Sequence, residues 1–355
     1  MSPKGIAIVI DSFESGGAQK QAFLLAKHLG LRNTVYLIVY HGHKIDAKFQ
    51  SRFNELTIEP IILNGNPLRK FLQLVRFFRT KKVDVVFTYL LLPNLIGGLA
   101  ANLAGVKLKV GGIRNSILDP KKEPIERFIH NYVNDFSVFN NHSGVKLLCQ
   151  KGFRKDKAVV IPNCFDIGKK LIIKRPDRLV TILSVGRFTE QKDYLTAIRV
   201  ISQLKTDGLS FKYVVVGWGA LENQLREWIT EFHLMNHVEL VINPTNMDDY
   251  YQDADIFLMT SLFEGLSNAV MEAMSFSLPV VATRAGDNDQ LVDSEKTGFL
   301  AEIGDIQNLA KGLSELISSP NMRNEFGERG YEKLKNEYGV ERFVDRYEQF
   351  IKQNV

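Results

Sequence analysis

The stretch from Asp255 to Thr283 constrains the fold more than any other part of this 355-residue chain. Ile256 to Met259 is an apolar run of strand length, and a second run begins at Pro279. Between the two runs, Ser267 to Ser275 has the apolar spacing of a helix, and its first serine or Asn268 is placed to cap the first turn. A strand, a helix and a second strand in this order predict a βαβ unit in a parallel sheet.

Two carboxylates interrupt this apolar unit. The predicted helix is apolar on almost every side, which is typical of a buried helix, yet Glu272 lies in its middle and Glu264 lies in the turn before it. A buried carboxylate is costly unless another group pairs with it. Glu272 therefore either faces a wet edge or a structural arginine, or it belongs to a ligand site. Such a site would combine the N–H groups of a helix N-terminus, which attract anions, with two carboxylates that accept hydrogen bonds from hydroxyls.

Alternating strand and helix patterns divide the chain into two α/β halves, each typical of a doubly wound parallel sheet. We expect a first domain over residues 1–165 and a second domain over residues 166–339, which begins with a linker. A final amphipathic helix is expected over residues 340–355. The strands expected in the first half are Ile6–Ile10, Val35–Tyr40, Ile61–Leu63, Val83–Tyr89, Lys107–Gly112, Phe136–Phe139 and Val159–Ile161. Those expected in the second half, besides the two runs above, are Leu179–Val185, Phe211–Val216 and Val238–Ile242.

Composition and charge limit the kind of protein. An apolar fraction of 45% and a charged fraction of 24% are those of a soluble globular protein. The first apolar run is too short for a signal peptide and no run could span a bilayer, so we expect a cytoplasmic protein. Residues 1–165 carry 24 Lys and Arg against 11 Asp and Glu, whereas the remainder carries 21 against 29. This asymmetry indicates that the first half meets something anionic, and since no nucleic-acid motif is present we expect a membrane surface rather than nucleic acid.

One segment of the basic half has the pattern of a helix that lies on a membrane. From Leu68 to Thr80, apolar and aromatic residues recur at helical spacing among basic side chains. The basic residues of this segment and of its end are Arg69, Lys70, Arg76, Arg79, Lys81 and Lys82. A basic amphipathic helix with aromatic residues can bind an anionic membrane, but a helix that packs on a sheet has the same pattern. The two interpretations are compatible.

Glycines and basic residues follow two further strands of the second half. Gly186 to Asp193 comes directly after a buried strand; there Arg187 can form a fork on phosphate oxygens and Lys192 adds a mobile charge. An ordinary charged loop has the same composition. Gly217-Trp218-Gly219 follows the next strand and has part of a dinucleotide fingerprint. The third small residue and the closing acidic residue are missing from the pattern, so we do not expect a nicotinamide site.

Weaker signals come from the remaining glycines and carboxylates. Gly16 and Gly17 stand at a strand-to-helix turn, where glycines let a ligand approach the backbone, although a plain tight turn needs them equally. Alternating carboxylates occur at Asp253-Ala254-Asp255 and at Asp287-Asn288-Asp289. No further ligands cluster near them in the sequence, so we expect no metal site.

Together these motifs resemble family four of the retaining glycosyltransferases, which have the GT-B fold: two facing Rossmann-like domains with the active site in the cleft between them. The resemblance covers nearly the whole chain. The motifs that carry it are Gly186-Arg187 through Lys192-Asp193, Gly217 and Gly219, Glu264 with Glu272 after seven residues, Gly16-Gly17-Ala18, Pro162-Asn163, Pro279–Thr283 and Thr297–Leu300. The resemblance implies that the second domain binds a nucleotide sugar, that the first lies on the acceptor side, and that the last helix packs back on the first.

The resemblance also implies a role for each residue of the site. Arg187 and Lys192 would hold the donor diphosphate, and their charge would replace a metal ion. Glu264 would bind a hydroxyl of the transferred sugar, and Glu272 the hydroxyls of the ribose. Positive groups aimed at the charge of the departing diphosphate lower the barrier to transfer, so Arg187 and Lys192 are expected to be catalytic. Glu264, at the transferred sugar, is the third expected catalytic residue. Further donor contacts are expected at Gly265, Leu266, Ser267, Asn268, Gly16, Gly17, Gly186 and Gly217.

Two positions depart from the family pattern. Many relatives carry a His in the first domain where this chain reads Arg114-Asn115-Ser116, so Arg114 or Asn115 would take its place. Gln290 stands where relatives often have Glu, and this change removes a charge near the donor.

The sequence therefore predicts a glycosyltransferase at the inner face of the cell membrane that extends a lipid-linked or surface polysaccharide. The expected donor is a uracil nucleotide that carries a hexose or an N-acetylhexosamine, with guanine and mannose as the next choice. Two alternatives remain open at this stage: a nucleotide-sugar epimerase of the same fold, and a non-catalytic binder of sugar nucleotides. Transfer needs an acceptor, whereas epimerisation does not.

Overall fold

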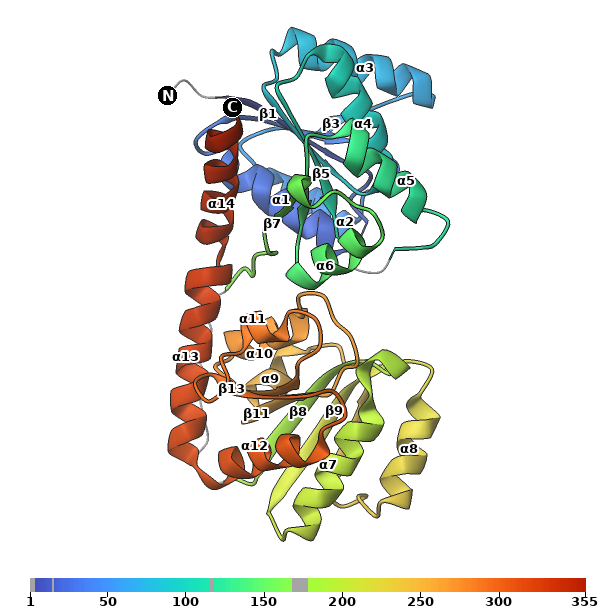
Figure 1. Cartoon of the computed structure of the whole chain (residues 1–355). Coiled ribbons are helices and arrows are strands. Elements are labelled where there is room, and N and C mark those ends of the chain that lie inside the picture. Colours follow the sequence, from blue (N-terminus) through green and yellow to red (C-terminus); the bar gives the residue numbers. More distant parts are fainter. Residues whose placement is uncertain (1–3, 15, 115–117, 168–177) are drawn as a thin grey trace. The chain divides into compact units, whose positions relative to one another are not determined.

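The structure is a computed structural model that describes residues 4–14, 16–114, 118–167 and 178–355, the side chain of Lys48 excepted. The chain divides into two units, the first made of Met1–Cys164 with Val340–Val355 and the second of Phe165–Gly339. The two crossings between units run side by side, because an isolated parallel bridge pairs Phe165 with Gly339. In Figure 1 each unit is a sheet covered by helices.

The first sheet is parallel throughout, and its seven described strands lie in the order β3-β2-β1-β4-β5-β6-β7. The interior strand β1 is buried on both faces, with Ile6 to Ile10 all 0% exposed, as expected where helices cover both sides of a parallel sheet. The strands are β1 (Gly5–Ile10), β2 (Thr34–Val39), β3 (Ile61–Ile62), β4 (Val85–Tyr89), β5 (Leu108–Ile113), β6 (Phe136–Phe139) and β7 (Ala158–Val160).

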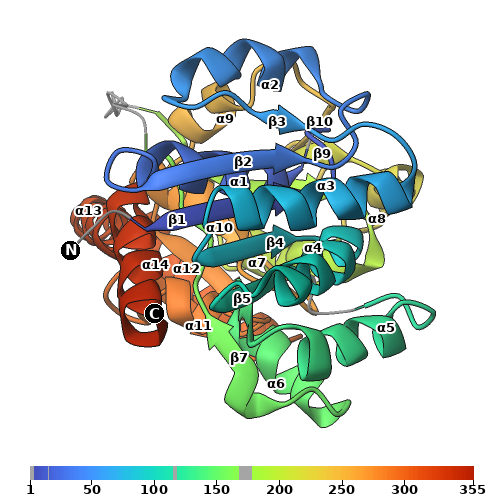
Figure 2. The same ribbon diagram turned by 90° about the horizontal axis from the view of Figure 1, so that it is seen from above.

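Helices cover the two faces of this sheet. The connecting helices are α1 (Gly17–Leu29), α2 (Ala47–Arg52), α3 (Pro67–Thr80), α4 (Leu91–Ala104), α5 (Glu123–Phe128) and α6 (His142–Gln150), with short turns η1 (Phe53–Glu55), η2 (Ile129–Val133) and η3 (Lys155–Lys157). The last helix, α14 (Val340–Asn354), shares a buried cluster with α1 through residues such as Phe343 and Tyr347. On the opposite face, α3 and α4 share a second cluster, and Figure 2 shows them side by side over the strands. Among the described helices, none has the length and apolar character needed to cross a bilayer.

The second sheet is also parallel, with six described strands in the order β10-β9-β8-β11-β12-β13. These strands are β8 (Val180–Arg187), β9 (Phe211–Trp218), β10 (Val238–Ile242), β11 (Ile256–Met259), β12 (Val280–Thr283) and β13 (Gly298–Ala301). The helices are η4 (Glu190–Lys192), α7 (Tyr194–Thr206), α8 (Glu222–Glu231), α9 (Asp248–Gln252), α10 (Asn268–Ser275), α11 (Asn288–Leu291), α12 (Ile306–Ser318) and α13 (Pro320–Tyr338). One apolar cluster gathers under α7 and α12, and another gathers around α10.

The prediction of two parallel α/β sheets is confirmed, and every predicted strand end lies within two residues of the observed one. The largest difference matters for the site: β8 and β9 run two residues further than expected, because Gly186 pairs with Gly217 and Arg187 with Trp218. Arg187 is therefore the last residue of a strand and not the second residue of a loop. The sequence missed α2, α9, α11 and β13, which have only four to six residues and are too short to show a hydrophobic period.

Candidate active site

Two neighbouring strands of the second sheet, β8 and β11, define where a ligand can bind. β8 lies between β9 and β11, so the chain proceeds in opposite directions across the sheet from this point. In open parallel sheets, ligands bind beyond the carboxyl ends of the strands at such a switch point. Gly186 and Arg187 end β8, and the segment from Thr260 to Glu264 follows β11. The topology therefore brings both predicted motifs to the same end of the sheet.

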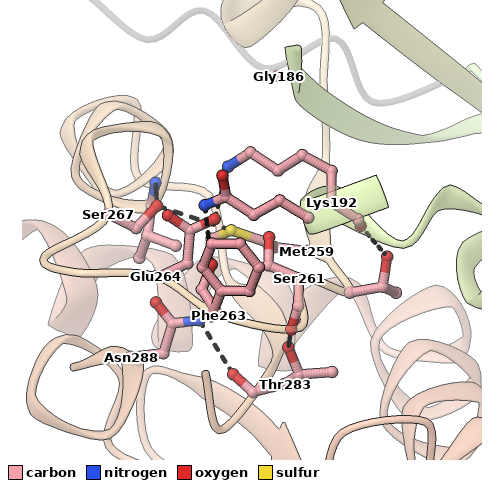
Figure 3. A network of polar contacts seen from close by, with 12 residues as sticks. Gly186, Lys192, Met259, Ser261, Phe263, Glu264, Ser267, Thr283 and Asn288 are labelled. Carbon is pink, nitrogen blue, oxygen red and sulfur yellow. Dashed lines mark hydrogen bonds and ion pairs between the residues drawn. The ribbon is translucent and has the colours of Figure 1, made fainter. Parts of the chain in front are cut away.

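Lys192 and Glu264 form an ion pair at this end of the sheet, as Figure 3 shows. The Lys192 Nζ atom lies 2.6 Å from Glu264 Oε1, and the two side chains are only 17% and 10% exposed. Water screens the attraction within a pair this buried only weakly. Among the described residues the Lys192 ammonium bonds to Glu264 alone, so two of its three N–H donors remain available to an anion.

Backbone hydrogen bonds fix the two loops that carry this pair. The Leu262 N–H donates to the carbonyl oxygen of Gln191 over 2.8 Å, and the Gln191 side chain donates back to the Phe263 carbonyl, also over 2.8 Å. The Thr260 hydroxyl donates to the carbonyl of Lys192 over 3.0 Å. The loops after β8 and β11 thus form one braced structure, so the ion pair is held by the backbone as well as by its own charges.

Gly186 and Gly217 pair across β8 and β9 where a larger side chain would not fit. A Cβ atom on Gly217 would lie 1.9 Å from the carbonyl oxygen of Gly186, and one on Gly186 would lie 3.1 Å from Lys192 Cε. Gly217 is therefore required for strand packing, whereas a side chain on Gly186 would only crowd the path of the Lys192 side chain. Their predicted contact with a ligand stays a prediction.

Arg187 ends β8 with an exposed side chain. Within the part of the chain that the structure describes, no carboxylate lies within ion-pair distance of its guanidinium. A planar guanidinium without a carboxylate partner, at the end of the strand that leads to Lys192, is a group suited to phosphate oxygens.

The loop from Glu264 to the start of α10 completes the group of predicted residues. Ser267 caps α10, since its hydroxyl oxygen accepts from the Val270 N–H over 3.4 Å, as the sequence predicted. The first N–H groups of a helix have no partner within the helix, so the segment Gly265–Asn268 presents donors to an anion or a hydroxyl. Gly286 supports the loop from beneath: its φ is +62°, and a Cβ there would lie 2.3 Å from the carbonyl oxygen of Glu264.

Glu272 has a partner that the sequence did not reveal. Its Oε2 atom accepts a hydrogen bond of 2.8 Å from the hydroxyl of Tyr251 on α9, and the side chain of Glu272 is half-buried. Tyr251 in turn stacks on Phe276 at 5.3 Å. Burial raises the pKa of Tyr251 well above its ordinary value, and the Glu272 carboxylate raises it further, so this hydroxyl stays protonated and remains a donor. The carboxylate therefore pairs with a tyrosine, which neither the wet-edge nor the arginine interpretation anticipated.

Comparison with known proteins identifies the kind of enzyme. Residues 170–333 match the family Glycosyl transferases group 1. The chain is a glycosyltransferase. The N-acetylgalactosamine-N,N'-diacetylbacillosaminyl-diphospho-undecaprenol 4-alpha-N-acetylgalactosaminyltransferase of Campylobacter jejuni is 28% identical over 359 residues, which cover 93% of this chain and 94% of that relative. The UDP-Gal:alpha-D-GlcNAc-diphosphoundecaprenol alpha-1,3-galactosyltransferase of Escherichia coli is 26% identical over 310 residues, 79% of this chain and 78% of that one.

Solved structures confirm the predicted GT-B fold for this glycosyltransferase. Anabaena HepE, crystallised in complex with UDP, superposes with a TM-score of 0.79 at 19% identity, over 98% of this chain and 100% of HepE. The lipopolysaccharide outer core galactosyltransferase WaaB superposes with a TM-score of 0.76 at 14% identity, over 99% of this chain and 100% of WaaB.

Some of the predicted site residues of this glycosyltransferase belong to the first unit, whereas Lys192 and Glu264 belong to the second. Gly16 and Gly17 are exposed at the N-terminus of α1. Arg114 directly follows β5 and is held in place: its Cζ lies 4.6 Å from the Tyr89 ring centroid, and its Nη1 donates to Asn163 Oδ1 over 2.9 Å. Asn115 and Ser116 lie outside the described residues. The replacement of the family His by Arg114 or Asn115 stays a prediction.

Sequence reasoning missed a buried polar group beneath the Glu264 loop of the glycosyltransferase. Ser261, Thr283 and Asn288 are all 0% exposed. The Thr283 hydroxyl donates to the Ser261 carbonyl over 2.6 Å, and the Asn288 amide donates to the Thr283 carbonyl over 2.9 Å, as drawn in Figure 3. The only sequence signal was the alternating motif Asp287-Asn288-Asp289, for which the sequence predicted no metal site. Among the described residues no three His, Cys, Asp or Glu side chains are placed to hold a metal ion, and Asn288 instead ties β12 to α11.

Proposed function

We propose that this glycosyltransferase moves a hexose or N-acetylhexosamine from a uridine diphosphate donor to a saccharide carried on a lipid diphosphate, with retention of configuration. The observation that carries the proposal is the buried Lys192–Glu264 ion pair at the carboxyl end of the second sheet, where β8 ends in the exposed Arg187. The two relatives named above are called diphospho-undecaprenol glycosyltransferases that form alpha linkages, and one of them is named for UDP-Gal. These names support a lipid-linked acceptor and a uracil nucleotide.

The charges of the site suit the bond that must break. As the acceptor oxygen bonds to the anomeric carbon, the bond from that carbon to the diphosphate breaks, and the acceptor proton passes to the departing phosphate. Negative charge grows on the diphosphate during this step. Arg187 and the two available N–H donors of Lys192 would stabilise that charge, and prearranged donors of this kind contribute about 3 kcal/mol each to transition-state stabilisation. Glu264 would hold the Lys192 ammonium in position and accept a hydrogen bond from a sugar hydroxyl. No metal ion is needed in this scheme.

Two further assignments belong to the proposal. Glu272, oriented by the Tyr251 hydroxyl, would bind the hydroxyls of the ribose. The N–H groups between Gly265 and Asn268 would contact the sugar. Oriented carboxylates and unfilled helix N–H groups are the ordinary partners of hydroxyls and anions, respectively.

A transfer assay tests the proposal. Radiolabelled UDP-galactose, UDP-N-acetylglucosamine and UDP-N-acetylgalactosamine are each incubated with a diphospholipid-linked sugar, and the lipid is extracted into butanol. We expect label in the lipid fraction with one of the donors, and a loss of roughly a hundredfold in rate for Lys192→Met. Lys296→Met, an exposed lysine of the same unit, serves as the matched control. Conversion of the nucleotide sugar without acceptor would show an epimerase, and binding without any turnover would show a non-catalytic binder.

We also propose that the first unit contacts an anionic membrane. Successive helices on one face of its sheet carry large apolar side chains that are exposed. These are Leu68 (68%) and Leu72 (55%) on α3, Leu99 (44%) and Leu103 (54%) on α4, and Ile125 (46%), Phe128 (53%) and Tyr132 (73%) on α5 and η2. Scattered apolar residues are normal, but a run over three neighbouring helices, next to the excess of basic residues in this unit, suits a lipid surface.

Vesicle co-sedimentation tests this contact. Binding to phosphatidylglycerol vesicles should exceed binding to phosphatidylcholine vesicles and fall steeply as salt is added, because exposed charges are screened within about 8 Å at physiological ionic strength. Leu72→Ser and Phe128→Ser should weaken binding, whereas Met235→Ser, at an equally exposed apolar residue of the second unit, should not. Binding that is independent of salt and of both substitutions would contradict the membrane role.

A further inference from the structure

A pocket in the first unit has the chemistry of an anion site, and no predicted role uses it. It has a volume of about 490 Å³ and lies beyond the carboxyl ends of β2 and β3, next to the first turn of α3. Its lining includes Tyr40, His41, His43, Asn64 and Lys70. The carboxyl ends of parallel strands are where open α/β sheets bind ligands.

The strongest signal in this pocket is a buried lysine without a counter-charge. Lys70 is 8% exposed. Its Nζ atom donates to the Tyr40 carbonyl oxygen over 2.5 Å and lies 4.3 Å from the centroid of the Tyr40 ring. Nowhere in the described residues does a carboxylate pair with Lys70. Removing an ammonium from water costs several kcal/mol, and one carbonyl and one ring face offset only part of that cost. An anion bound here would supply the missing charge.

Three further polar side chains, Tyr40, His41 and His43, line the same pocket. Tyr40 is only 2% exposed, and its buried hydroxyl has no hydrogen-bond partner among the described residues. His43 is exposed at the pocket and packs edge-on against His41, with ring centroids 5.6 Å apart. His41 also pairs with Asp11, whose Oδ1 lies 3.1 Å from His41 Nδ1, so one carboxylate does lie near the pocket. A hydroxyl, an imidazole and an ammonium around one cavity match the oxygens of a phosphate group.

An apolar groove continues from this pocket along the same helix. The groove has a volume of about 380 Å³ and shares Ile62, Leu63 and Asn64 with the pocket. Its other lining residues include Ile38, Leu74 and Phe77, with Arg76 and Lys81 at the end of α3. An anion pocket that opens into an apolar groove fits a molecule with a phosphate head and a hydrocarbon tail better than it fits a free phosphate.

We infer that this pocket and groove bind the diphosphate and the adjoining prenyl chain of the lipid-linked acceptor. Lys70 would pair with the diphosphate, His43 and the Tyr40 hydroxyl would donate to it, and the first isoprene units would lie along Ile62 and Phe77. The inference rests on the proposed function, since it names where that acceptor is held. It assigns a recognition role to the lipid diphosphate itself, separate from the sugar that receives the new residue.

Isothermal titration calorimetry with geranyl diphosphate, a short soluble prenyl diphosphate, tests the inference. Saturating UDP is present throughout, so that the donor site is filled. We expect geranyl diphosphate to bind the wild type, inorganic pyrophosphate to bind at least tenfold more weakly, and geraniol not to bind. Lys70→Met should weaken geranyl diphosphate binding at least tenfold, because a charge-assisted pair in a buried site is lost. Lys146→Met removes the same charge from an exposed position in the same unit and should leave binding unchanged.

A second variant covers the possibility that Lys70→Met does not fold. Ile62 is 42% exposed on the edge strand β3, so Ile62→Glu is compatible with the fold while it places a negative charge in the groove. It should weaken geranyl diphosphate binding and spare UDP binding. The inference would be overturned if geranyl diphosphate did not bind the wild type, or if it bound the variants as tightly as the wild type. It would also be overturned if pyrophosphate bound the wild type as tightly as geranyl diphosphate does. UDP affinity, measured separately, distinguishes this failure from failure of the proposed function, which would instead lose UDP binding.

Discussion

Glu126 gives the most quantitative prediction that the structure offers. This residue lies on α5, is 8% exposed, and its Oε2 atom has no hydrogen-bond partner among the described residues. Burial raises the pKa of its carboxyl from 4.5 to about 7, although a hydrogen bond from Asn94 and the nearby charge of Lys122 lower it. The folded protein therefore keeps a proton on Glu126 in a pH range where the unfolded chain has lost it.

The sign and size of the effect follow from this difference. Because the folded-state pKa is raised, the stability that protonated Glu126 contributes is fully present below pH 4.5 and is lost as the pH rises to about 7. One pKa unit corresponds to about 1.4 kcal/mol, so ionisation of this buried carboxyl costs about 3 kcal/mol at pH 8. That is a large share of the roughly 5–15 kcal/mol that stabilises a typical domain.

Glu126→Gln removes the charge and keeps a side chain that can accept the hydrogen bond from Asn94. Urea unfolding followed by circular dichroism should show the variant more stable than wild type by about 3 kcal/mol at pH 8, and by less than about 1 kcal/mol at pH 5. Glu59→Gln, at an exposed carboxylate of the same unit, should change neither value appreciably. Both tryptophans lie in the second unit, so their fluorescence reports that unit separately. A difference between Glu126→Gln and wild type that is equal at pH 5 and pH 8 would refute the reasoning.

Four further substitutions test the site. Glu264→Gln should lower kcat by about a hundredfold and also lower the stability of the protein, because it leaves the largely buried Lys192 ammonium without its ion-pair partner; an unchanged kcat would exclude both roles proposed for this carboxylate. Glu272→Ala should weaken UDP binding in calorimetry while its circular dichroism spectrum stays that of the wild type. Tyr251→Phe should weaken UDP binding less. If both variants bound UDP as tightly as the wild type, the ribose assignment would be wrong. Gly286→Ala should lower the melting temperature and the transfer rate together, since a left-handed backbone costs a non-glycine residue about 1–2 kcal/mol and its Cβ would meet the Glu264 carbonyl oxygen; a variant as stable and active as wild type would show that the loop adapts.

The sequence by itself determined the architecture, and it supplied the residues proposed for the site. Continuous apolar runs such as Ile256–Met259 can be satisfied only by strands buried on both faces, and this requirement fixed two parallel sheets and hence the carboxyl ends at which ligands bind. The Ser267 cap could also be predicted, because capping depends on the residue type at one local position. A short element such as α11 could not be predicted, since four residues are too few to show a hydrophobic period.

Only the tertiary structure decided which side chains meet. Lys192 and Glu264 are 72 residues apart, and their ion pair depends on β8 and β11 being neighbours, which no local pattern encodes. The same holds for Tyr251, which reaches Glu272 from another helix, and for the pocket that contains Lys70. Secondary structure follows from short-range periodicity and steric preference, whereas a binding site is made of long-range contacts whose partners are set by strand order and packing.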